Sequence, residues 1–277
     1  MYARAQTWWT ILRIALEERL VYRGDFALGT LMRFLPIITQ IFLWWAIFAS
    51  MRADTGVTDQ TIRGYNYSDF VAYYLLTMLA RAFSSMPGLS SGVAREVRDG
   101  DIKRFLVQPI DMLGFLLLSR VAHKLAYYSV AILPFALVFF LCGSYFPALP
   151  DASTILAFVC SLCLGFLLGF FLEASLGLLS FWFLEVTSLL FVYMLFSFFL
   201  SGHMFPLDML PEPLNEWVTW SPFSYLAYFP ASIWLGKVEG AELAWKLVAE
   251  VAWVLFFIVL SRWLFARGVR RYSGFGG

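Results

Sequence analysis

Charged residues are scarce in this chain. Lysine, arginine, aspartate and glutamate make up only 14% of its 277 residues, against about 25% in a typical soluble domain. Hydrophobic residues reach 61%, which is more than one water-soluble core can cover. The net charge of +1 gives no indication of nucleic-acid binding. These shortages exclude an ordinary soluble domain and predict an integral membrane protein.

Residues that carry catalytic chemistry are also few. The chain has three cysteines and two histidines. Cys160 and Cys163 form a C-x-x-C, but no second pair or nearby histidine completes a metal site, so we interpret them as small apolar residues of a helix. No G-x-x-x-x-G-K-[ST] phosphate-binding loop occurs. We therefore expect no catalytic residue, no metal and no cofactor in this chain.

Six apolar stretches predict membrane spans, since a helix needs about 20 apolar residues to cross a ~30 Å hydrocarbon core. They are residues 28–50, 70–88, 116–141, 154–177, 180–202 and 244–265. Residues 1–27 precede them, with Trp9, Leu12, Leu16 and Leu20 at helical spacing and polar residues between. This pattern is typical of an amphipathic helix that lies on the membrane surface. The predicted fold is one all-α transmembrane domain, residues 1–277.

Lysine and arginine gather on one side of these spans. The rich side has Arg4, Arg13, Arg19, Arg23, Arg95, Arg98, Lys103, Arg104, Arg262, Arg267, Arg270 and Arg271, and the poor side has Arg52, Arg63 and Lys237. The bias predicts that both termini and the connection around residue 100 face the cytoplasm. Residues 203–235, here named the outer segment, then lie on the opposite side.

The outer segment is divided by prolines yet is strongly apolar and aromatic. Its prolines precede a short helix from Pro213 to Trp220 and a second piece, residues 223–235. At ~1.5 Å per residue neither piece can cross the membrane, and irregular backbone is tolerated at membrane depth only when protein or a water-filled cavity surrounds it. A re-entrant helical hairpin and a surface loop with interfacial tryptophans both fit. Trp217, Trp220 and Trp234 suit an interfacial belt or, less readily, sugar stacking.

Residues 93–109 form the most charged connection. Arginines, a lysine and acidic residues alternate there with Val97, Ile102, Phe105 and Leu106, while Gly100 interrupts the helix and Pro109 ends it. Two short helices with apolar contacts suit docking against a soluble partner. A helix that holds its cations near lipid phosphates is the other interpretation.

Two polar residues near the predicted spans have open roles. Arg81 lies within the second span, where a charge is expensive. It either lines a substrate path or has a structural role, paired with a glutamate or extended inward to the membrane surface. His203 begins the outer segment, where a structural role is more common than a catalytic one. Gly165 and Gly169 form a G-x-x-x-G in the fourth span that permits close helix packing.

The order of these features resembles that of type-2 ABC transporter permeases. The cytoplasmic motif E-x-x-x-G-x-I/L-x-x-x-L-x-x-P reads Glu96, Gly100, Ile102, Leu106 and Pro109. The late motifs read Ser201, Gly202, Pro206, Leu210, Pro211, and then Pro222, Phe223, Tyr225 and Pro230. The ending P-F-x-Y-x-x-x-x-P is similar to that of one subgroup of export permeases, and the resemblance covers nearly the whole chain.

The resemblance implies a partner and a mechanism. Two permease subunits, identical or paralogous, would pair in the cytoplasmic (inner) membrane, and each would bind one cytoplasmic ABC ATPase that holds ATP and Mg. Residues 93–109, the coupling segment, would dock on the ATPase through Arg95, Glu96, Val97, Arg98, Asp99, Gly100, Asp101, Ile102, Lys103, Arg104, Phe105 and Leu106. The outer segment would close the pathway through Gly202, Pro206, Pro211, Trp217, Trp220, Pro222, Phe223 and Tyr225. The alternative is a stand-alone membrane scaffold or intramembrane enzyme without an ATPase.

Overall fold

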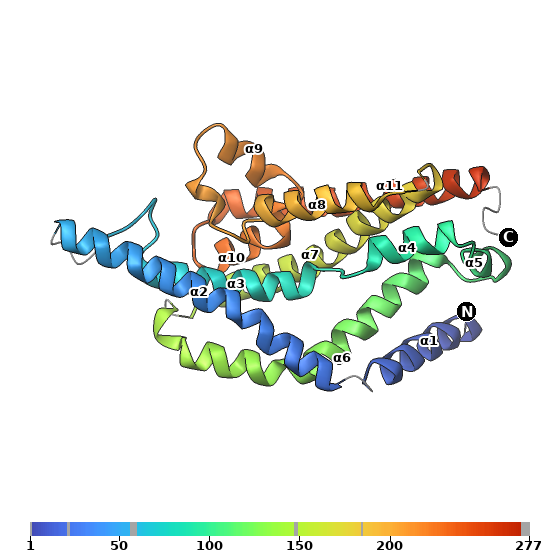
Figure 1. The fold of residues 1–277 in the computed structure, drawn as a ribbon, viewed down its shortest axis with the longest axis horizontal. Coiled ribbons are helices and arrows are strands. Elements are labelled where there is room, and N and C mark those ends of the chain that lie inside the picture. Colours follow the sequence, from blue (N-terminus) through green and yellow to red (C-terminus); the bar gives the residue numbers. More distant parts are fainter. Residues whose placement is uncertain (1, 21–22, 56–59, 147–148, 184, 273–277) are drawn as a thin grey trace. The chain divides into compact units, whose positions relative to one another are not determined.

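The computed structural model describes residues 2–20, 23–55, 60–146, 149–183 and 185–272. Within these ranges the regular structure is helical (Figure 1). The long helices are α1 (Tyr2–Leu20), α2 (Arg23–Thr55), α3 (Tyr67–Ser84), α6 (Met112–Leu141), α7 (Ala152–Leu178), α8 (Thr187–Leu200) and α11 (Gly240–Arg271). The shorter ones are α4 (Leu89–Arg98), α5 (Lys103–Val107), α9 (Leu214–Trp220) and α10 (Tyr228–Trp234), with 3₁₀ turns η1 (Gly143–Tyr145), η2 (Leu179–Phe181), η3 (Leu207–Met209) and η4 (Ser224–Leu226).

Within the described residues, four helices are long and apolar enough to cross a membrane. These candidate spans are Leu28–Asp54, Met112–Leu141, Ala152–Phe181 and Gly240–Arg271. They contain the predicted spans 28–50, 116–141, 154–177 and 244–265, which confirms a polytopic membrane protein. The predicted count of six stays a prediction, because the other two stretches differ from an ordinary span.

The helix predicted over residues 70–88 is α3, which ends earlier, at Ser84. Every residue from Phe70 to Leu76 is at most 4% exposed. A helix covered by protein on all sides does not need the apolar composition that lipid demands. This burial explains why α3 can carry Asp69 and Arg81 and fall outside the candidate spans.

The helix predicted over residues 180–202 is α8, which begins later, at Thr187. Its 14 residues would be roughly 21 Å long, less than the ~30 Å of a hydrocarbon core. Only Ser197 of this helix is buried, so α8 is the opposite of α3: apolar, short and exposed along its length. The predicted boundary between the spans 154–177 and 180–202 corresponds to the end of α7 and the turn η2.

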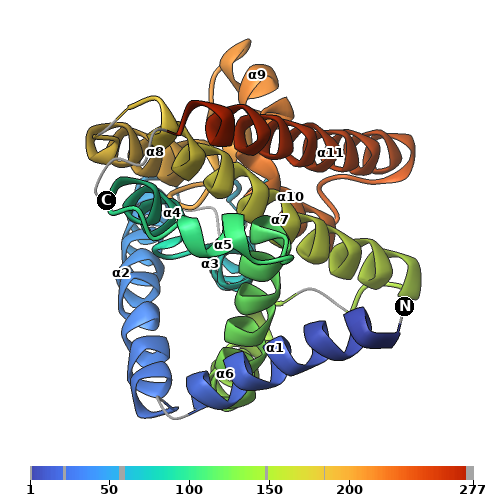
Figure 2. The same cartoon turned by 90° about the vertical axis from the view of Figure 1, so that its right-hand side faces the viewer.

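The chain divides into two compact units, and the first comprises residues 1–75 and 109–148. In this unit α1 packs against α6 (Figure 2). The ring of Trp8, half-buried, would lie 3.2 Å from a Cβ added at Gly114, whereas Trp9 is exposed. Trp8 therefore makes a close contact of α1 with α6. The surface location predicted for residues 1–27 stays a prediction.

Aromatic contacts join α2 to the first half of α3 in the same unit. The rings of Trp44 and Phe70 stack with centroids 3.7 Å apart. The indole N–H of Trp44 donates to the hydroxyl of Tyr74 at 2.9 Å. A stacked aromatic pair adds about 0.5–1.5 kcal/mol beyond its buried area. This cluster therefore holds the first half of α3 against α2.

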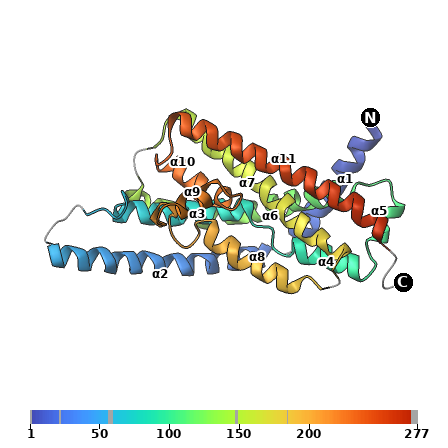
Figure 3. The same ribbon diagram turned by 90° about the horizontal axis from the view of Figure 1, so that it is seen from above.

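The second unit comprises residues 76–108 and 149–277, and α7 lies at its centre. Helix α7 packs along α11, as Figure 3 shows, and also contacts α4, η4 and α10. Three glycines spaced by multiples of four residues, Gly165, Gly169 and Gly177, lie on one face of α7. Each brings a backbone oxygen of another element close to the helix.

The contacts of the three glycines are very tight. An added Cβ would lie 3.2 Å from the carbonyl oxygen of Tyr225 at Gly165, and 2.1 Å from that of Ser84 at Gly169. At Gly177 it would lie 2.7 Å from the carbonyl oxygen of Ser90. The close packing predicted for the G-x-x-x-G motif is confirmed, and Gly177 extends it to α4.

The close approach at Gly169 predicts a large effect of a single methyl group. We expect Gly169→Ala to lower the apparent melting temperature in detergent by about 5–10 °C, because overpacking against rigid backbone costs roughly 1–3 kcal/mol or more. Gly92→Ala in α4 is the matched control, since an added Cβ there meets nothing within 4 Å. Unchanged melting of Gly169→Ala would contradict this packing.

Candidate functional site

The coupling segment folds as two short helices joined by a tight turn. The amide of Asp99 donates to the carbonyl of Arg95 at 2.8 Å, and the amide of Ile102 donates to the carbonyl of Glu96 at 3.0 Å. Gly100 makes this turn with a φ of +84°, a conformation that side chains with a Cβ rarely adopt. The break that the sequence predicts at Gly100 therefore has a defined geometry.

Most of the apolar residues predicted to dock face the chain itself. Val97, Ile102 and Phe105 are buried, and Ile102 is fully inaccessible. They hold the turn and α5 in place, and α4 as a whole packs on α7 and η2. In this conformation these side chains are not available to a partner. The close backbone contact at Gly177 holds α4 against α7.

The exposed side of the coupling segment is charged with an apolar end. Leu106 and Val107 close α5 and are 39% and 81% exposed. The exposed charged residues are Arg95, Arg98, Asp99, Asp101, Lys103 and Arg104. Sequence reasoning missed Val107, although its position next to Leu106 at the end of an apolar–basic run was a usable signal.

The coupling segment forms ion pairs within itself and with the connection before α8. Arg104 Nη2 donates to Glu96 Oε1 at 2.5 Å, while the second oxygen of Glu96 is buried and accepts no hydrogen bond within the described residues. Arg98 Nη1 lies 3.9 Å from Glu185 Oε2, in the connection before α8. The Arg98–Glu185 pair is more than half exposed, so it contributes little to stability.

The two carboxyl groups have opposite pKa shifts. Burial raises the pKa of Glu96 above its ordinary value, and the neighbouring Arg104 only partly offsets this effect. Hydrogen bonds from Thr187 lower the pKa of Glu185, with a smaller contribution from Arg98. The folded chain therefore disfavours charge on Glu96 and favours it on Glu185.

The outer segment has a buried half and an exposed half. The residues from Ser224 to Ile233, in η4 and α10, are all buried, whereas Trp217 in α9 is 78% exposed. Among the predicted gate residues Gly202, Pro206 and Tyr225 are buried, Pro222 and Phe223 are half-buried, and Pro211, Trp217 and Trp220 are exposed. A solvated loop is wrong for η4 and α10, while re-entry into the membrane stays a prediction.

Hydrogen bonds attach the buried half to the rest of the second unit. The hydroxyl of Ser84 donates to the carbonyl of Leu226 at 2.7 Å. The amide of Tyr228 donates to the carbonyl of Ser201 at 2.9 Å. Because these polar backbone groups are satisfied by protein, the irregular backbone of the outer segment meets the condition for burial away from water.

Arg81 is half-buried and points its guanidinium toward α8. Its Nη1 donates to Ser197 Oγ at 3.5 Å. Tyr193, also on α8, interacts electrostatically with both Arg81 and Glu173. His203 stacks edge-on to Phe198, with ring centroids 5.0 Å apart. Arg81 thus belongs to a polar cluster between α3, α7 and α8, which fits both roles that the sequence left open.

Glu250 in α11 is a buried polar residue that sequence reasoning missed. Its side chain is 0% exposed and accepts a hydrogen bond from Ser161 Oγ of α7 at 3.2 Å. One turn before it, buried Lys246 pairs with Glu242 at 2.8 Å. The signal was available, because Glu242, Lys246 and Glu250 recur every four residues and share one face of α11.

No metal site emerges among the residues that the structure describes, since they contain no group of three or more His, Cys, Asp or Glu side chains suited to hold an ion. Cys160 and Cys163 are free and exposed on α7. Their surroundings fit the interpretation as small apolar residues of a span.

The opposite pKa shifts predict opposite pH dependences. Glu96 stabilises the folded chain at a pH below its ordinary pKa, and this contribution is lost as the pH rises through its raised pKa. The apparent melting temperature of Glu96→Gln should therefore rise relative to that of the parent between about pH 4 and 7. Glu185 stabilises the folded chain at a pH above its ordinary pKa, and this contribution is lost as the pH falls through its lowered pKa. The apparent melting temperature of Glu185→Gln should therefore fall relative to that of the parent as the pH rises over the same range. Parallel slopes of the two variants would contradict the assigned environments.

Comparison with known proteins identifies the family. The model of a family described as "ABC-2 family transporter protein" matches residues 34–276, which is most of the chain. A search of curated proteins found no match. The matched region includes the coupling segment, the outer segment and all four candidate spans except the first residues of the first. The chain therefore belongs to the ABC-2 transporter family and is a multi-pass permease component of an ABC transporter.

Proposed function

We propose that this chain is the membrane-spanning permease subunit of an ATP-driven exporter, paired with a second permease subunit and driven by separate ABC ATPase subunits. The ATPase would bind ATP with Mg and hydrolyse the ATP. The pair resides in the cytoplasmic (inner) membrane with both termini in the cytoplasm. Family membership implies an ABC ATPase partner in general, and the lysine and arginine bias supports the orientation.

One observation carries the proposal: the coupling segment is rigidly mounted and presents an exposed docking end. Its inner residues pack within the chain, so they fix the position of the turn. Leu106 and Val107 remain outside, surrounded by exposed charges. An apolar centre with a charged rim is the usual anatomy of a protein–protein interface.

The glycine face of α7 supplies a route from this docking end to the outer segment. Gly177 contacts the backbone of α4, and Gly165 contacts the backbone of η4. Close-packed interiors transmit displacement because they cannot be compressed. ATP-driven approach of the two ATPases would move the coupling segment, and α7 would move the outer segment with it.

The pathway itself follows from the family resemblance. It would run along the first, second and fifth predicted spans, which are α2, α3 and α8, with the outer segment as the closing element. Helix α8 suits this role, because it is exposed along its length and carries the polar cluster of Arg81 at Ser197. A stand-alone scaffold or intramembrane enzyme is supported by no arrangement in the described residues.

The docking end predicts a sharp effect of two substitutions. We expect Leu106→Asp with Val107→Asp to weaken binding to the cognate ABC ATPase by about 100-fold or more, because each lost apolar contact contributes roughly 1.5–3 kcal/mol. The melting temperature should stay near that of the parent, since both side chains are exposed. Co-purification and permease-stimulated ATP hydrolysis measure the effect.

A matched control places the same change elsewhere. Trp217→Asp removes a similarly exposed apolar side chain from α9 in the outer segment and should leave ATPase binding unchanged. Full binding by the Leu106→Asp, Val107→Asp variant would refute the docking assignment. Absence of any ABC ATPase that binds the parent chain would favour the stand-alone alternative.

A further inference from the structure

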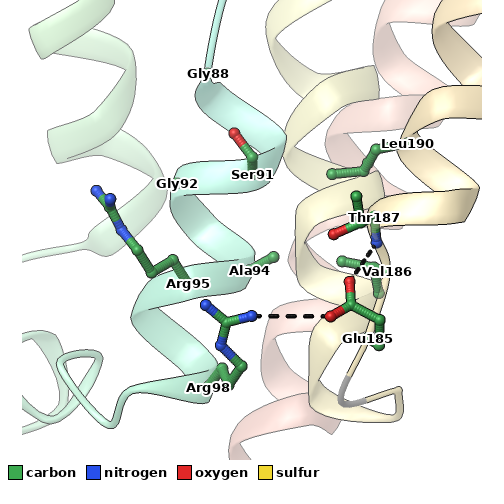
Figure 4. Close-up of a pocket in the computed structure, with 10 residues that line it drawn as sticks. All are labelled: Gly88, Ser91, Gly92, Ala94, Arg95, Arg98, Glu185, Val186, Thr187 and Leu190. Carbon is green, nitrogen blue, oxygen red and sulfur yellow. Dashed lines mark hydrogen bonds and ion pairs between the residues drawn. The ribbon is translucent and has the colours of Figure 1, made fainter.

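A cavity of about 440 Å³ lies between α4 and the start of α8, within the second unit (Figure 4). Its walls come from Ser91, Gly92, Ala94, Arg95 and Arg98 on α4 and from Glu185, Val186, Thr187 and Leu190 at α8, with Gly88 at one end. Ligand pockets in proteins span about 300–1,000 Å³, so the cavity can hold a small polar group.

The polar wall of the cavity is suited to an anion. Figure 4 shows the guanidinium of Arg98 extended across the opening toward Glu185, while that of Arg95 lies at the rim and is turned away from α8. The hydroxyls of Ser91 and Thr187 add donors, and the first amides of the 14-residue helix α8 carry the positive end of its dipole.

An anion already occupies part of this environment, because Glu185 is placed there by the chain. Its Oε1 accepts from the amide of Thr187 at 2.8 Å, and its Oε2 lies 3.9 Å from Arg98 Nη1. Arg98 also donates through Nε to Asp99 at 3.2 Å. The long separation from Arg98 and the exposure of both side chains leave Glu185 free to turn outward when a stronger anion enters.

The remaining walls and the position of the cavity indicate the chemical class of that anion. Ala94, Val186 and Leu190 are apolar, and Glu185 is an isolated charge between two uncharged, mostly apolar stretches, residues 174–184 and 186–200. Basic pockets between membrane helices on the cytoplasmic side bind lipid headgroups, and the proposed orientation puts this cavity on that side. Arginine is suited to phosphate because its planar donors bind two oxygens at once.

We propose that this cavity binds a phosphate group, supplied by the headgroup of an anionic phospholipid or by free phosphate, with Glu185 as the internal anion that it displaces. Arg98 is the principal ligand, with Thr187 and Ser91 beside it, and Arg95 adds positive charge at the rim. The site does not depend on an ATPase partner, but its assignment to lipid phosphates rests on the cytoplasmic orientation in the proposed function.

The test uses the full chain in lipid-depleted detergent. Native mass spectrometry compares retention of phosphatidylglycerol with that of phosphatidylcholine bearing the same acyl chains, and phosphorus NMR follows binding of inorganic phosphate in a second arm. We expect selective retention of phosphatidylglycerol, a phosphate response, or both. Arg98→Gln should weaken whichever binds by about tenfold or more, the loss expected for one charge-assisted hydrogen bond.

Three further variants make the outcome specific. Gly92→Leu should abolish binding by filling the cavity without loss of stability, because an added Cβ there meets nothing within 4 Å. Glu185→Gln should strengthen binding, since it removes the competing charge. Lys103→Gln deletes an exposed cation that does not line the cavity, and it should leave binding unchanged. Melting temperatures verify that each variant is folded.

Each outcome decides the proposal. Binding of phosphatidylglycerol alone assigns the site to a lipid, and binding of inorganic phosphate alone assigns it to free phosphate. If neither probe binds the parent chain, the proposal is wrong. It is also wrong if folded Arg98→Gln and Gly92→Leu bind as tightly as the parent, or if Lys103→Gln weakens binding as much as Arg98→Gln.

Discussion

The close approach of foreign backbone to one face of α7 is the constraint on which the second unit depends. Only glycine leaves room for the carbonyl oxygens of Tyr225, Ser84 and Ser90 at positions 165, 169 and 177. In a membrane the hydrophobic effect does little to hold helices together, so close van der Waals contact and buried hydrogen bonds must do so. One turn before Gly165, the bond from Ser161 to Glu250 joins α11 to α7.

This constraint gives the two functional regions a common support. The coupling segment and the buried half of the outer segment contact the same helix, twelve positions apart at Gly177 and Gly165, or about 18 Å along its axis. Both regions consist of short helices and turns whose polar backbone groups bond to other protein groups. Helix α8, by contrast, has one buried residue, Ser197, and contacts the rest of the second unit through Arg81 and the ring of Phe223. The second unit thus combines α7, which is tightly packed, with α8, which has few buried contacts. Elements with few buried contacts are the ones expected to move.

Much of this architecture could be predicted from the sequence. Run lengths located four spans, Gly100 located the break in the coupling segment, and Pro213 located the start of α9. The sequence could not predict whether an apolar side chain of the coupling segment faces the chain itself or a partner protein. Val97, Ile102 and Phe105 have the spacing of an interface, but the chain uses them to hold its own turn. The role of Glu250 was missed because the sequence shows a charged residue within a span but does not show its hydrogen-bond partner, Ser161 of α7. The burial of α3 depends on surrounding helices, which no local pattern describes.

The central claim is that the docking end of the coupling segment and the exposed half of the outer segment lie on opposite sides of the membrane. Single cysteines at Val107 and Trp217, in a chain whose three native cysteines are alanine, test it with a membrane-impermeant maleimide. The account predicts that the cysteine at Trp217 is labelled on intact cells, and that the one at Val107 is labelled only after the membrane is permeabilised. Labelling of the cysteine at Val107 on intact cells would contradict the account.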